Sequence, residues 1–578
     1  MNKKLLLRIL KYTDKYRGFL LGSALCAILS VAASLAGPIL IGSAIDSMAG
    51  AHGVDFTRIM SLLGALAFIY AGGSLFGWLL AYMTNRIAYG TVNDMRLQLF
   101  EKLNTLPLKF YDTNPHGDTI SRFINDMDTI SDGLLQGIST LLTGIVTIVG
   151  AIGFMLYINP LMALVVLLSS PASYFMSRFI SRRSQQMFRE QAKDLGRLNG
   201  YIEEIISGQK VVKAFNFEKR SFEQFQDING ALYNSGMKAQ FYSSLTNPST
   251  RLVNNITYTV IGIIGSIFAI LGKITVGGIS SFLIYSSLFA KPFNEISGVL
   301  AQLQAAAASA QRIFHILDLP PEAPDGKDAI PLSQSRGNIT FENVAFSYNP
   351  ERPLISNFNL KVKPGSRIAI VGQTGAGKTT LVNLLMRFYE VDGGSISVDG
   401  ANINTLTRDS LRRNFGMVLQ DTWLFEGSIR DNIAYGKPEA TDEEIMAAAK
   451  AADAHSFIRR LPRGYDTLLA DAGENLSQGQ KQLLTIARVM LVDPPMLILD
   501  EATSSIDTRT EIHIQKAFQK MMEGRTSFVI AHRLSTIREA DLILVMDKGN
   551  VVESGTHEEL LKAKGHYANL YNSQFAVS

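Results

Sequence analysis

The sequence predicts two parts of different fold class, a membrane α-helical domain at residues 1–317 and an α/β P-loop domain at residues 338–578. Long uncharged runs dominate the first part, and a phosphate-loop pattern stands in the second. A proline-rich, polar stretch at 318–337 lies between them and is the expected linker. Charged residues make up 18% of the 578-residue chain, below the usual share of about a quarter, as expected for a largely apolar protein.

The net charge gives no indication of a nucleic-acid partner, and the cysteine content excludes an intrachain disulfide. A net charge of +4 is too small for this length to indicate a nucleic-acid partner. A single cysteine excludes an intrachain disulfide. That residue, Cys26, lies in an apolar run and is expected to be a small buried hydrophobe.

The first 17 residues combine six lysines and arginines with five aliphatic residues. This pattern is typical of a basic amphipathic helix on a membrane surface. A secretory signal is the alternative, but the following uncharged run, Gly18–Ile45, is much longer than the apolar region of a signal. A retained membrane helix is therefore the preferred interpretation.

Further uncharged runs predict six membrane spans in all. The run from Gly133 to Ser177 is long enough for two crossings, and Asn159-Pro160 supplies the turn between them. The predicted spans are residues 18–47, 57–86, 133–158, 160–183, 250–272 and 275–300.

Lysine and arginine concentrate at the N-terminus and in two long connections, residues 86–132 and 178–251. The positive-inside rule therefore places both termini and these connections in the cytoplasm. The expected location is the cytoplasmic (inner) membrane, crossed several times.

Both long connections are predicted to be helical extensions of the spans, each with a break near its middle. The breaks lie at Phe110–Gly117 and at Phe215–Arg220. Helical hairpins that project so far indicate contact with a cytoplasmic partner or domain. A structureless loop is the alternative, but loops of this length are uncommon.

The last predicted span carries four aromatic residues on one helical face, Phe282, Tyr285, Phe289 and Phe293. They would either line a cavity for an apolar solute or pack against other helices and lipid, and packing is favoured. Lys291 and Glu295 are four residues apart and are expected to pair.

The stretch Ile368–Val382 matches the phosphate-loop pattern G-x-x-x-x-G-K-[ST] between a predicted strand and a predicted helix. Gly372, Thr374, Gly375 and Gly377 form a loop of small residues whose N–H groups can face phosphate oxygens. Lys378 would reach the β- and γ-phosphates, and Thr379, followed by Thr380, would ligate Mg²⁺. The second part is thus a predicted nucleotide-binding domain.

Three further apolar strands are predicted to end in polar residues, at Gln420, at Asp500-Glu501 and at His532. Ligands bind at this edge of a mostly parallel sheet. Hydrolysis of a phosphoanhydride requires an oriented water, supplied by Glu501, and charge neutralisation, supplied by Lys378, His532 and Mg²⁺. Tyr348, upstream of the loop, would stack on adenine or belong to the core.

Leu476-Ser-Gln-Gly-Gln480 precedes a predicted helix, so Ser477 and Gly479 head a second anion site. With this motif the chain resembles a half-size ATP-binding-cassette (ABC) exporter of the multidrug or lipid type over essentially its whole length. The resemblance implies ATP and Mg²⁺ as cofactors. It implies roles for Tyr348 in adenine stacking, Gln420 and Asp500 near Mg²⁺, Glu501 as general base, and His532 as the γ-phosphate switch.

In that family two nucleotide-binding domains close around two nucleotides, so the resemblance implies a second half-transporter as partner. Ser477, Gly479, Gln480 and Asp507 would complete the site of the facing chain. The breaks near Pro115 and Glu218 resemble coupling helices. Two departures, Gln478 in place of glycine and the stretch Asp471–Asn475, resemble the catalytically intact half of a heterodimer, so a heterodimer is favoured over a homodimer.

The expected function is export of a hydrophobic or amphipathic solute, a drug or a lipid, across the lipid bilayer. Peptide export is an alternative within transport. An ATP-gated channel or regulator is an alternative from another class, and Glu501 and His532 favour turnover over gating.

Overall fold

A computed structural model describes residues 3–48, 54–420, 422–469, 473, 475–500, 508–531 and 533–574. The chain divides into two units, which are treated separately. The helical unit comprises Met1–Asn104 and Asn114–Leu319, and the sheet unit comprises Thr105–Thr113 and Pro320–Ser578.

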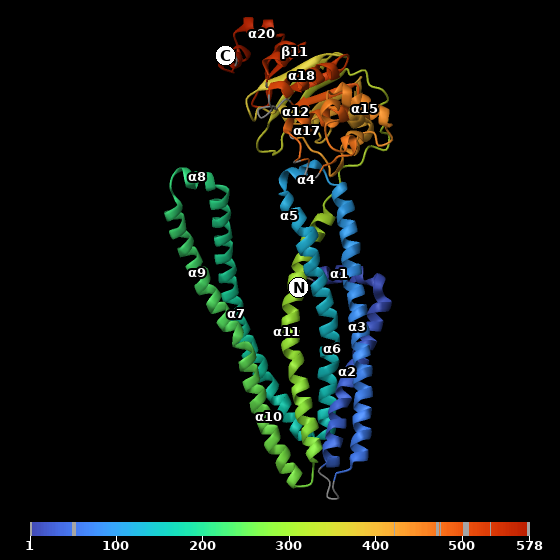
Figure 1. The fold of residues 1–578 in the computed structure, drawn as a ribbon, viewed down its shortest axis with the longest axis vertical. Helices are drawn as coiled ribbons and strands as arrows, with labels where there is room; N and C mark the ends of the chain where they lie inside the picture. The colour runs from blue at the N-terminus through green and yellow to red at the C-terminus, as the bar shows by residue number, and fades with distance from the viewer. Residues whose placement is uncertain are drawn as a thin grey trace. The chain divides into compact units, whose positions relative to one another are not determined.

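Long helices make up the helical unit (Figure 1). They are α1 (Lys3–Thr13), α2 (Arg17–Met48), α3 (Phe56–Asn104), α5 (His116–Ser121), α6 (Met127–Ile158), α7 (Pro160–Ser207), α8 (Gln209–Ala214), α9 (Glu218–Ser244), α10 (Thr246–Ile270) and α11 (Val276–Asp318). A π-helical turn, Arg122–Asp126, joins α5 to α6.

These helices form two groups. Helices α2, α3, α6 and α11 pack against one another, and α7 packs along α9 and α10. In Figure 1, α7 and α9 run side by side, and α8 lies at their far end. The turn between α6 and α7 follows from local chemistry, because the Asn159 side chain accepts hydrogen bonds from the N–H groups of Leu161 and Met162, and Pro160 begins α7.

Helices α2 and α11 approach closely through small residues. A Cβ atom at Gly277 would lie 1.9 Å from the carbonyl oxygen of Gly42, so only glycine fits there. Asp46 accepts a hydrogen bond of 2.7 Å from the Gly277 N–H, and the Ser281 hydroxyl donates one of 2.7 Å to the Pro38 carbonyl. The contact is therefore fixed by shape and by polar groups together.

The aromatic face of α11 is a packing surface. Phe282, Tyr285 and Phe289 are buried, and the Tyr285 ring stacks on Phe154 with centroids 5.2 Å apart. The Tyr285 hydroxyl donates to the Leu35 carbonyl. The packing interpretation is confirmed for these three residues, and Lys291 pairs with Glu295 at 3.6 Å, as predicted.

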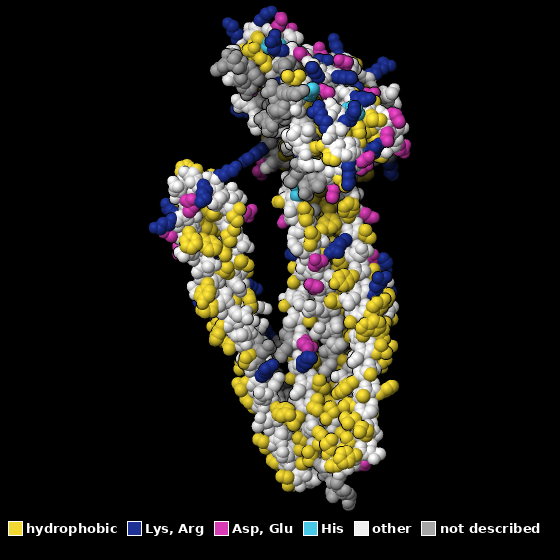
Figure 2. All heavy atoms as spheres, viewed as in Figure 1, with side chains coloured by type: hydrophobic (Ala, Val, Ile, Leu, Met, Phe, Trp, Pro, Cys, Tyr) yellow, Lys and Arg dark blue, Asp and Glu magenta, His cyan; other side chains and the backbone are white. Residues whose placement is uncertain are grey.

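Within the described residues, four helical stretches are long and apolar enough to cross a membrane. They are Leu7–Met48, Phe56–Asn104, His116–Ile158 and Glu218–Ile270. All six predicted spans fall on helices, but the number six stays a prediction. Hydrophobic side chains cover one end of the helical unit in Figure 2, as expected of a lipid-facing surface.

The sheet unit contains short strands and helices. Its strands are β1 (Ile339–Phe346), β2 (Ile355–Val362), β3 (Arg367–Gly372), β4 (Gly393–Val398), β5 (Ala401–Asn402), β6 (Phe415–Val418), β7 (Gly427–Ser428), β8 (Leu468–Leu469), β9 (Met496–Asp500), β10 (Thr526–Ile530), β11 (Leu542–Asp547) and β12 (Asn550–Gly555). Its helices are α4 (Leu108–Thr113), α12 (Lys378–Leu385), α13 (Arg408–Arg413), α14 (Ile429–Ala434), α15 (Asp442–Ala451), α16 (His455–Ile458), α17 (Gln478–Val492), α18 (Thr508–Met522), α19 (Leu534–Arg538), α20 (His557–Ala563) and α21 (His566–Gln574).

The main sheet has the order β12-β11-β3-β10-β9-β6, with β12 antiparallel and the other strands parallel. Alternate residues of β3 enter different cores. Ala369 and Val371 pack with α14, α15 and α17, whereas Ile368 and Ile370 pack toward the smaller antiparallel sheet, β2-β1-β4-β5. Burial on both faces explains why these strands read as continuous apolar runs.

The predicted linker is partly structured within the sheet unit. Arg408, which is buried, forms ion pairs with Asp325 at 2.8 Å and with Glu390 at 2.6 Å. The Glu322 N–H donates to the Thr105 carbonyl at 2.7 Å, next to α4. Residues 322–325 are therefore bound to the sheet unit by hydrogen bonds and ion pairs, next to α4.

Candidate functional site

The phosphate loop connects β3 to α12, as the pattern predicts. Gly377 caps α12 with φ of +95°, a left-handed conformation that favours glycine. Lys378 then begins the helix, so the first N–H groups of α12 point back into the loop. The loop therefore presents backbone donors and a helix N-terminus to an anion.

The Lys378 ammonium lies across this loop. It donates to the carbonyl oxygens of Gly372 at 2.8 Å and Gln373 at 3.1 Å. Burial lowers the pKa of Lys378, and the nearby charge of Asp500 opposes that shift. A phosphate in the loop would add negative charge beside the half-buried cation and favour its protonated form.

The strand order brings other predicted residues to the same edge. Val418 of β6 pairs with Leu499 of β9, so Gln420 follows β6 close to Asp500, which ends β9. Strand β10 lies between β9 and β3. Because these strands are parallel, Gln420 and Asp500 share the edge at which the phosphate loop begins. Glu501, Asp507 and His532 lie outside the described residues.

Tyr348 lies beside the helix that follows the loop. Its hydroxyl is 3.3 Å from the Thr380 hydroxyl and accepts from the Asn383 side chain at 3.4 Å. The side chain is 41% exposed, which leaves ring surface available for stacking. Tyr348 is thus not a core tyrosine.

Ser477 and Gln480 form a capping box at the N-terminus of α17. The Ser477 hydroxyl accepts from the Gln480 N–H at 3.3 Å, and the Gln480 side chain accepts from the Ser477 N–H at 3.0 Å. Gly479 is buried, whereas Ser477 is exposed. The box holds the helix terminus in place and leaves the serine on the surface.

Two residues of α17 contact the segment that follows Gln420, and the sequence analysis did not foresee this. The Gln478 side chain donates to the Thr422 hydroxyl at 3.3 Å. Arg488 donates to the Asn432 carbonyl at 2.8 Å and lies over the Tyr435 ring at 5.3 Å. Burial lowers the pKa of Arg488. No local pattern marks these contacts, because they join segments far apart in the sequence.

The sequence analysis also missed Tyr389. Its ring makes a T-shaped contact with Tyr348, with centroids 5.0 Å apart, and its hydroxyl donates to Asp112 of α4. Burial, together with Asp112, raises the pKa of Tyr389 above its ordinary range. An aromatic pair thus connects α4 to the predicted adenine position.

The oxygen donors at this edge fit a hard cation. A hydroxyl from Thr379, an amide from Gln420 and a carboxylate from Asp500 match the preference of Mg²⁺ for oxygen. Within the described ranges, no group of three His, Cys, Asp or Glu side chains could hold a metal ion alone.

The chain matches two known families. Residues 20–293 match the ABC transporter transmembrane region, and residues 355–504 match the ABC transporter family.

Relatives cover nearly the whole chain. An uncharacterized ABC transporter ATP-binding protein of Bacillus subtilis is 45% identical over 99% of this chain and 94% of that protein. A fatty acid ABC transporter ATP-binding/permease protein of Mycobacterium bovis is 44% identical over 89% and 82% of the two chains. An ATP-dependent lipid A-core flippase of Desulfotalea psychrophila is 37% identical over 99% and 100%.

A solved structure has the same fold. A bacterial Atm1-family ABC exporter with ATP bound superposes with a TM-score of 0.77 and 30% identity, covering 97% of this chain and 98% of that one. An N-terminal helical membrane domain, a phosphate loop at the edge of a parallel sheet and these relatives agree. The chain therefore belongs to the ABC transporter family, as a half-size exporter whose ATPase activity is coupled to transport.

Proposed function

We propose that this chain hydrolyses ATP at the Gly372–Thr380 loop to drive export of a hydrophobic or amphipathic solute. The observation that carries the proposal is that the phosphate loop, with Lys378 donating to the Gly372 carbonyl at 2.8 Å, begins at the sheet edge where Asp500 and Gln420 also lie. Tyr348 would stack on adenine, and the loop N–H groups would bind the phosphates.

Each residue of the site has a proposed task. When bound, Mg²⁺ neutralises charge on the β- and γ-phosphates, and Thr379, Gln420 and Asp500 would hold it. Glu501 orients and deprotonates the attacking water, and His532 donates to the γ-phosphate. Lys378 moves no proton; it stabilises the negative charge that develops in the transition state.

The site is proposed to be completed by a second chain. Ser477, Gly479 and Gln480 would face the γ-phosphate bound to the partner, with Asp507 near the same interface. The exposed position of Ser477 supports this arrangement. The two departures from the usual motifs support a heterodimer in which this chain carries the intact catalytic base, and a homodimer is the alternative.

The solute is proposed to be a lipid, a fatty acid or an amphipathic drug. Two relatives are named for fatty acid transport and lipid A-core flipping. The proposed location is the cytoplasmic membrane with both termini in the cytoplasm, as the distribution of lysine and arginine predicts. Peptide export and an ATP-gated channel remain the alternatives.

The variant Glu501→Gln tests the proposed turnover. Because only the base is lost, the variant should bind ATP with wild-type affinity and hydrolyse it at least about 100-fold more slowly. Binding is measured with a fluorescent ATP analogue and hydrolysis by phosphate release. Glu523→Gln, at an exposed position of the same unit, is the control and should keep full activity. Hydrolysis at the wild-type rate in Glu501→Gln would remove Glu501 from its role.

A further inference from the structure

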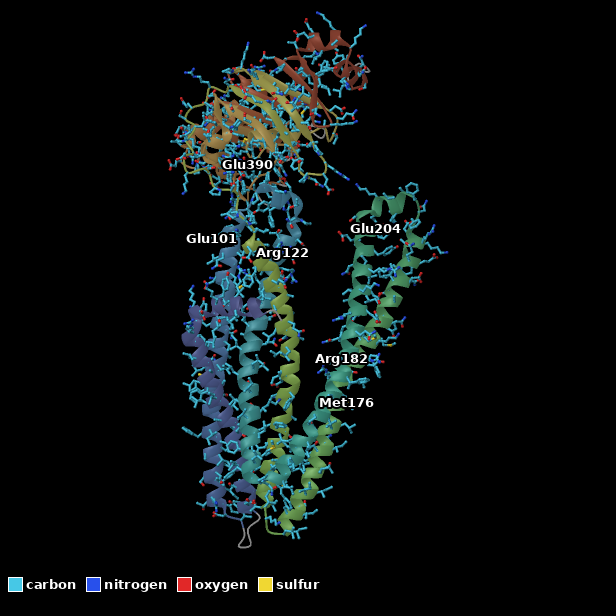
Figure 3. The ribbon with its side chains drawn as sticks, turned by 180° about the vertical axis from the view of Figure 1, so that it is seen from behind. Glu101, Arg122, Met176, Arg182, Glu204 and Glu390 are labelled. Carbon is cyan, nitrogen blue, oxygen red and sulfur yellow. The ribbon has the colours of Figure 1, made fainter. Side chains whose placement is uncertain are left out.

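A recess of about 650 Å³ opens in the helical unit between α1 and the last turns of α11, beside the π-helical turn. Figure 3 labels Arg122 where the chain passes from α5 into α6, next to α11. The charged and ionisable side chains that line it are Arg8, Arg122, Arg312, His315 and Asp318. Its wall thus carries three guanidinium groups and one imidazole against one carboxylate.

The carboxylate partner of Arg312 lies behind the wall. Asp126 is 7% exposed and accepts from Arg312 Nε at 2.9 Å, whereas the Arg312 side chain is half exposed. Asp126 is compensated mainly by this pair, and it also interacts electrostatically with Arg122. One edge of the Arg312 guanidinium remains directed toward solvent.

Arg122 and Asp126 are the two ends of the π-helical turn. A π-turn inserts one extra residue into a helix and is frequent at functional sites. Here it directs Asp126 to Arg312 and Arg122 into the recess. Among the described residues, Arg122 forms an ion pair with Asp118 at 3.6 Å, which is too long for a hydrogen bond, and Asp118 is exposed.

The other side of the recess has an apolar floor and a cation. Arg8 lies over the Phe314 ring at 4.1 Å and forms a bidentate pair with Asp318 at 2.6 and 2.8 Å. Leu5, Ala308 and Phe314 add apolar surface. The recess therefore offers apolar contact next to positive charge, which suits an anion attached to an acyl chain.

The recess lies at the level of α1, an amphipathic helix with Leu7 and Leu10 exposed. Tyr12 of α1 donates to Gln98 of α3 at 2.7 Å, and Lys15, in the 3-10 turn after α1, pairs with Asp94 of α3 at 2.9 Å. Asp94 and Gln98 lie 9 and 13 residues past Asn85, where the uncharged run of α3 ends, and the uncharged run of α2 begins at Gly18, directly after α1 and the turn that follows it. A basic amphipathic helix that directly precedes a predicted span is expected to lie at the membrane surface.

We propose that this recess binds the phosphate group of an anionic lipid from the adjoining leaflet, with Arg8, Arg122 and Arg312 facing the phosphate and Leu5 and Phe314 contacting the acyl chain. The proposal rests on the chain lying in a bilayer and is independent of the nucleotide site. Free phosphate shares the headgroup chemistry, so the test separates the two sources.

The test is a lipid titration of the full-length complex, purified in detergent and followed by native mass spectrometry. Phosphatidylglycerol and phosphatidylcholine with identical acyl chains are compared, and inorganic phosphate is added as a competitor. Wild-type protein should prefer phosphatidylglycerol. Arg8→Gln and Arg122→Gln should each weaken that binding about fivefold, as expected for one basic residue at an anionic surface. Both leave behind exposed carboxylates, so folding should be kept.

Arg96→Gln is the matched control, because Arg96 forms an exposed ion pair with Asp128 in the same unit and does not line the recess. It should leave lipid binding unchanged, and Arg122→Lys should restore most of what Arg122→Gln loses. Equal binding of both lipids, with phosphate binding that depends on Arg122, would assign the recess to free phosphate. Unchanged phosphatidylglycerol affinity in the Arg8→Gln/Arg122→Gln protein, or an equal loss in Arg96→Gln, would overturn the proposal.

Discussion

Two short helices of this chain, α4 and α8, lie within the two long connections between predicted spans but differ in their surroundings. Helix α4 belongs to the sheet unit, with Phe110 buried and Asp112 accepting from Tyr389. Helix α8 belongs to the helical unit and exposes Val211 and the adjoining Phe215, the latter at 77%. One helix thus has its protein contact within the chain, and the other presents apolar side chains to solvent.

The difference indicates that α4 contacts the sheet unit of its own chain, whereas α8 contacts a second chain. Exposed aromatic residues at the end of a hairpin are costly in water unless a partner covers them. The proposed dimer supplies such a partner, because a second half-transporter would bring its own sheet unit to α8. The comparison is therefore an argument for a second chain, drawn from this chain's surface.

The largest loss of ATPase activity is expected for Lys378→Ala, and a second variant distinguishes a heterodimer from a homodimer. Lys378→Ala should lower ATPase activity at least about 100-fold in any dimer, because it removes a charge that stabilises the transition state. Ser477→Arg distinguishes the assemblies. In the favoured heterodimer, Ser477 faces the partner's weaker site, so activity should fall only several-fold. ATPase is measured on the complex isolated through a tag on this chain.

In a homodimer, Ser477→Arg would be as damaging as Lys378→Ala, since every site would contain both residues. A gel of the isolated complex shows whether it contains one chain or two. One chain with full ATPase activity and equal losses in the two variants would contradict the heterodimer.

The sequence predicts the phosphate loop and the strand ends because both are local patterns. A loop of glycines before Lys378, and apolar runs that stop at Gln420 and Asp500, need no long-range information. The turn at Asn159-Pro160 is of the same kind. The parallel strand order then brings these segments to one edge, as expected for this sheet type.

Contacts between distant segments could not be predicted in this way. Tyr389 and Asp112 are 277 positions apart, and neither lies in a recognisable motif. The π-turn at Arg122–Asp126 has no sequence signature either, and Asp126 at its end pairs with Arg312 of another helix. Such pairs are fixed by tertiary packing, which a single sequence does not reveal.

An intermediate loss of ATPase activity is expected when Phe215, the exposed aromatic residue next to α8, is replaced. Phe215→Ser should leave the melting temperature of the isolated chain unchanged, because the side chain is already in water. It should lower the ATPase activity of the complex about tenfold, as expected when an aromatic anchor of an interface is removed. The melting temperature is measured on the isolated chain, and the ATPase activity on the complex.

Tyr233→Ser is the matched control for Phe215→Ser, because Tyr233 is 68% exposed on α9 but lies far from α8. It should keep wild-type activity. Phe110→Ser in α4 should instead lower the melting temperature, since Phe110 is buried. If Phe215→Ser keeps full ATPase activity, the conclusion that a second chain contacts α8 is wrong.

The smallest effect on ATPase activity is expected beside helix α4, where Tyr389 connects α4 to Tyr348. Tyr389→Phe keeps the ring contact and removes the hydrogen bond to Asp112, so ATP affinity should stay unchanged while kcat falls a few-fold. Tyr348→Phe is the matched control, because it removes only weak hydroxyl contacts of 3.3 and 3.4 Å and should change neither value. Asp112→Asn retains an acceptor oxygen and should behave closer to wild type than Asp112→Ala. A loss of ATP affinity in Tyr389→Phe, with kcat unchanged, would make this tyrosine part of the adenine site and not a link to α4.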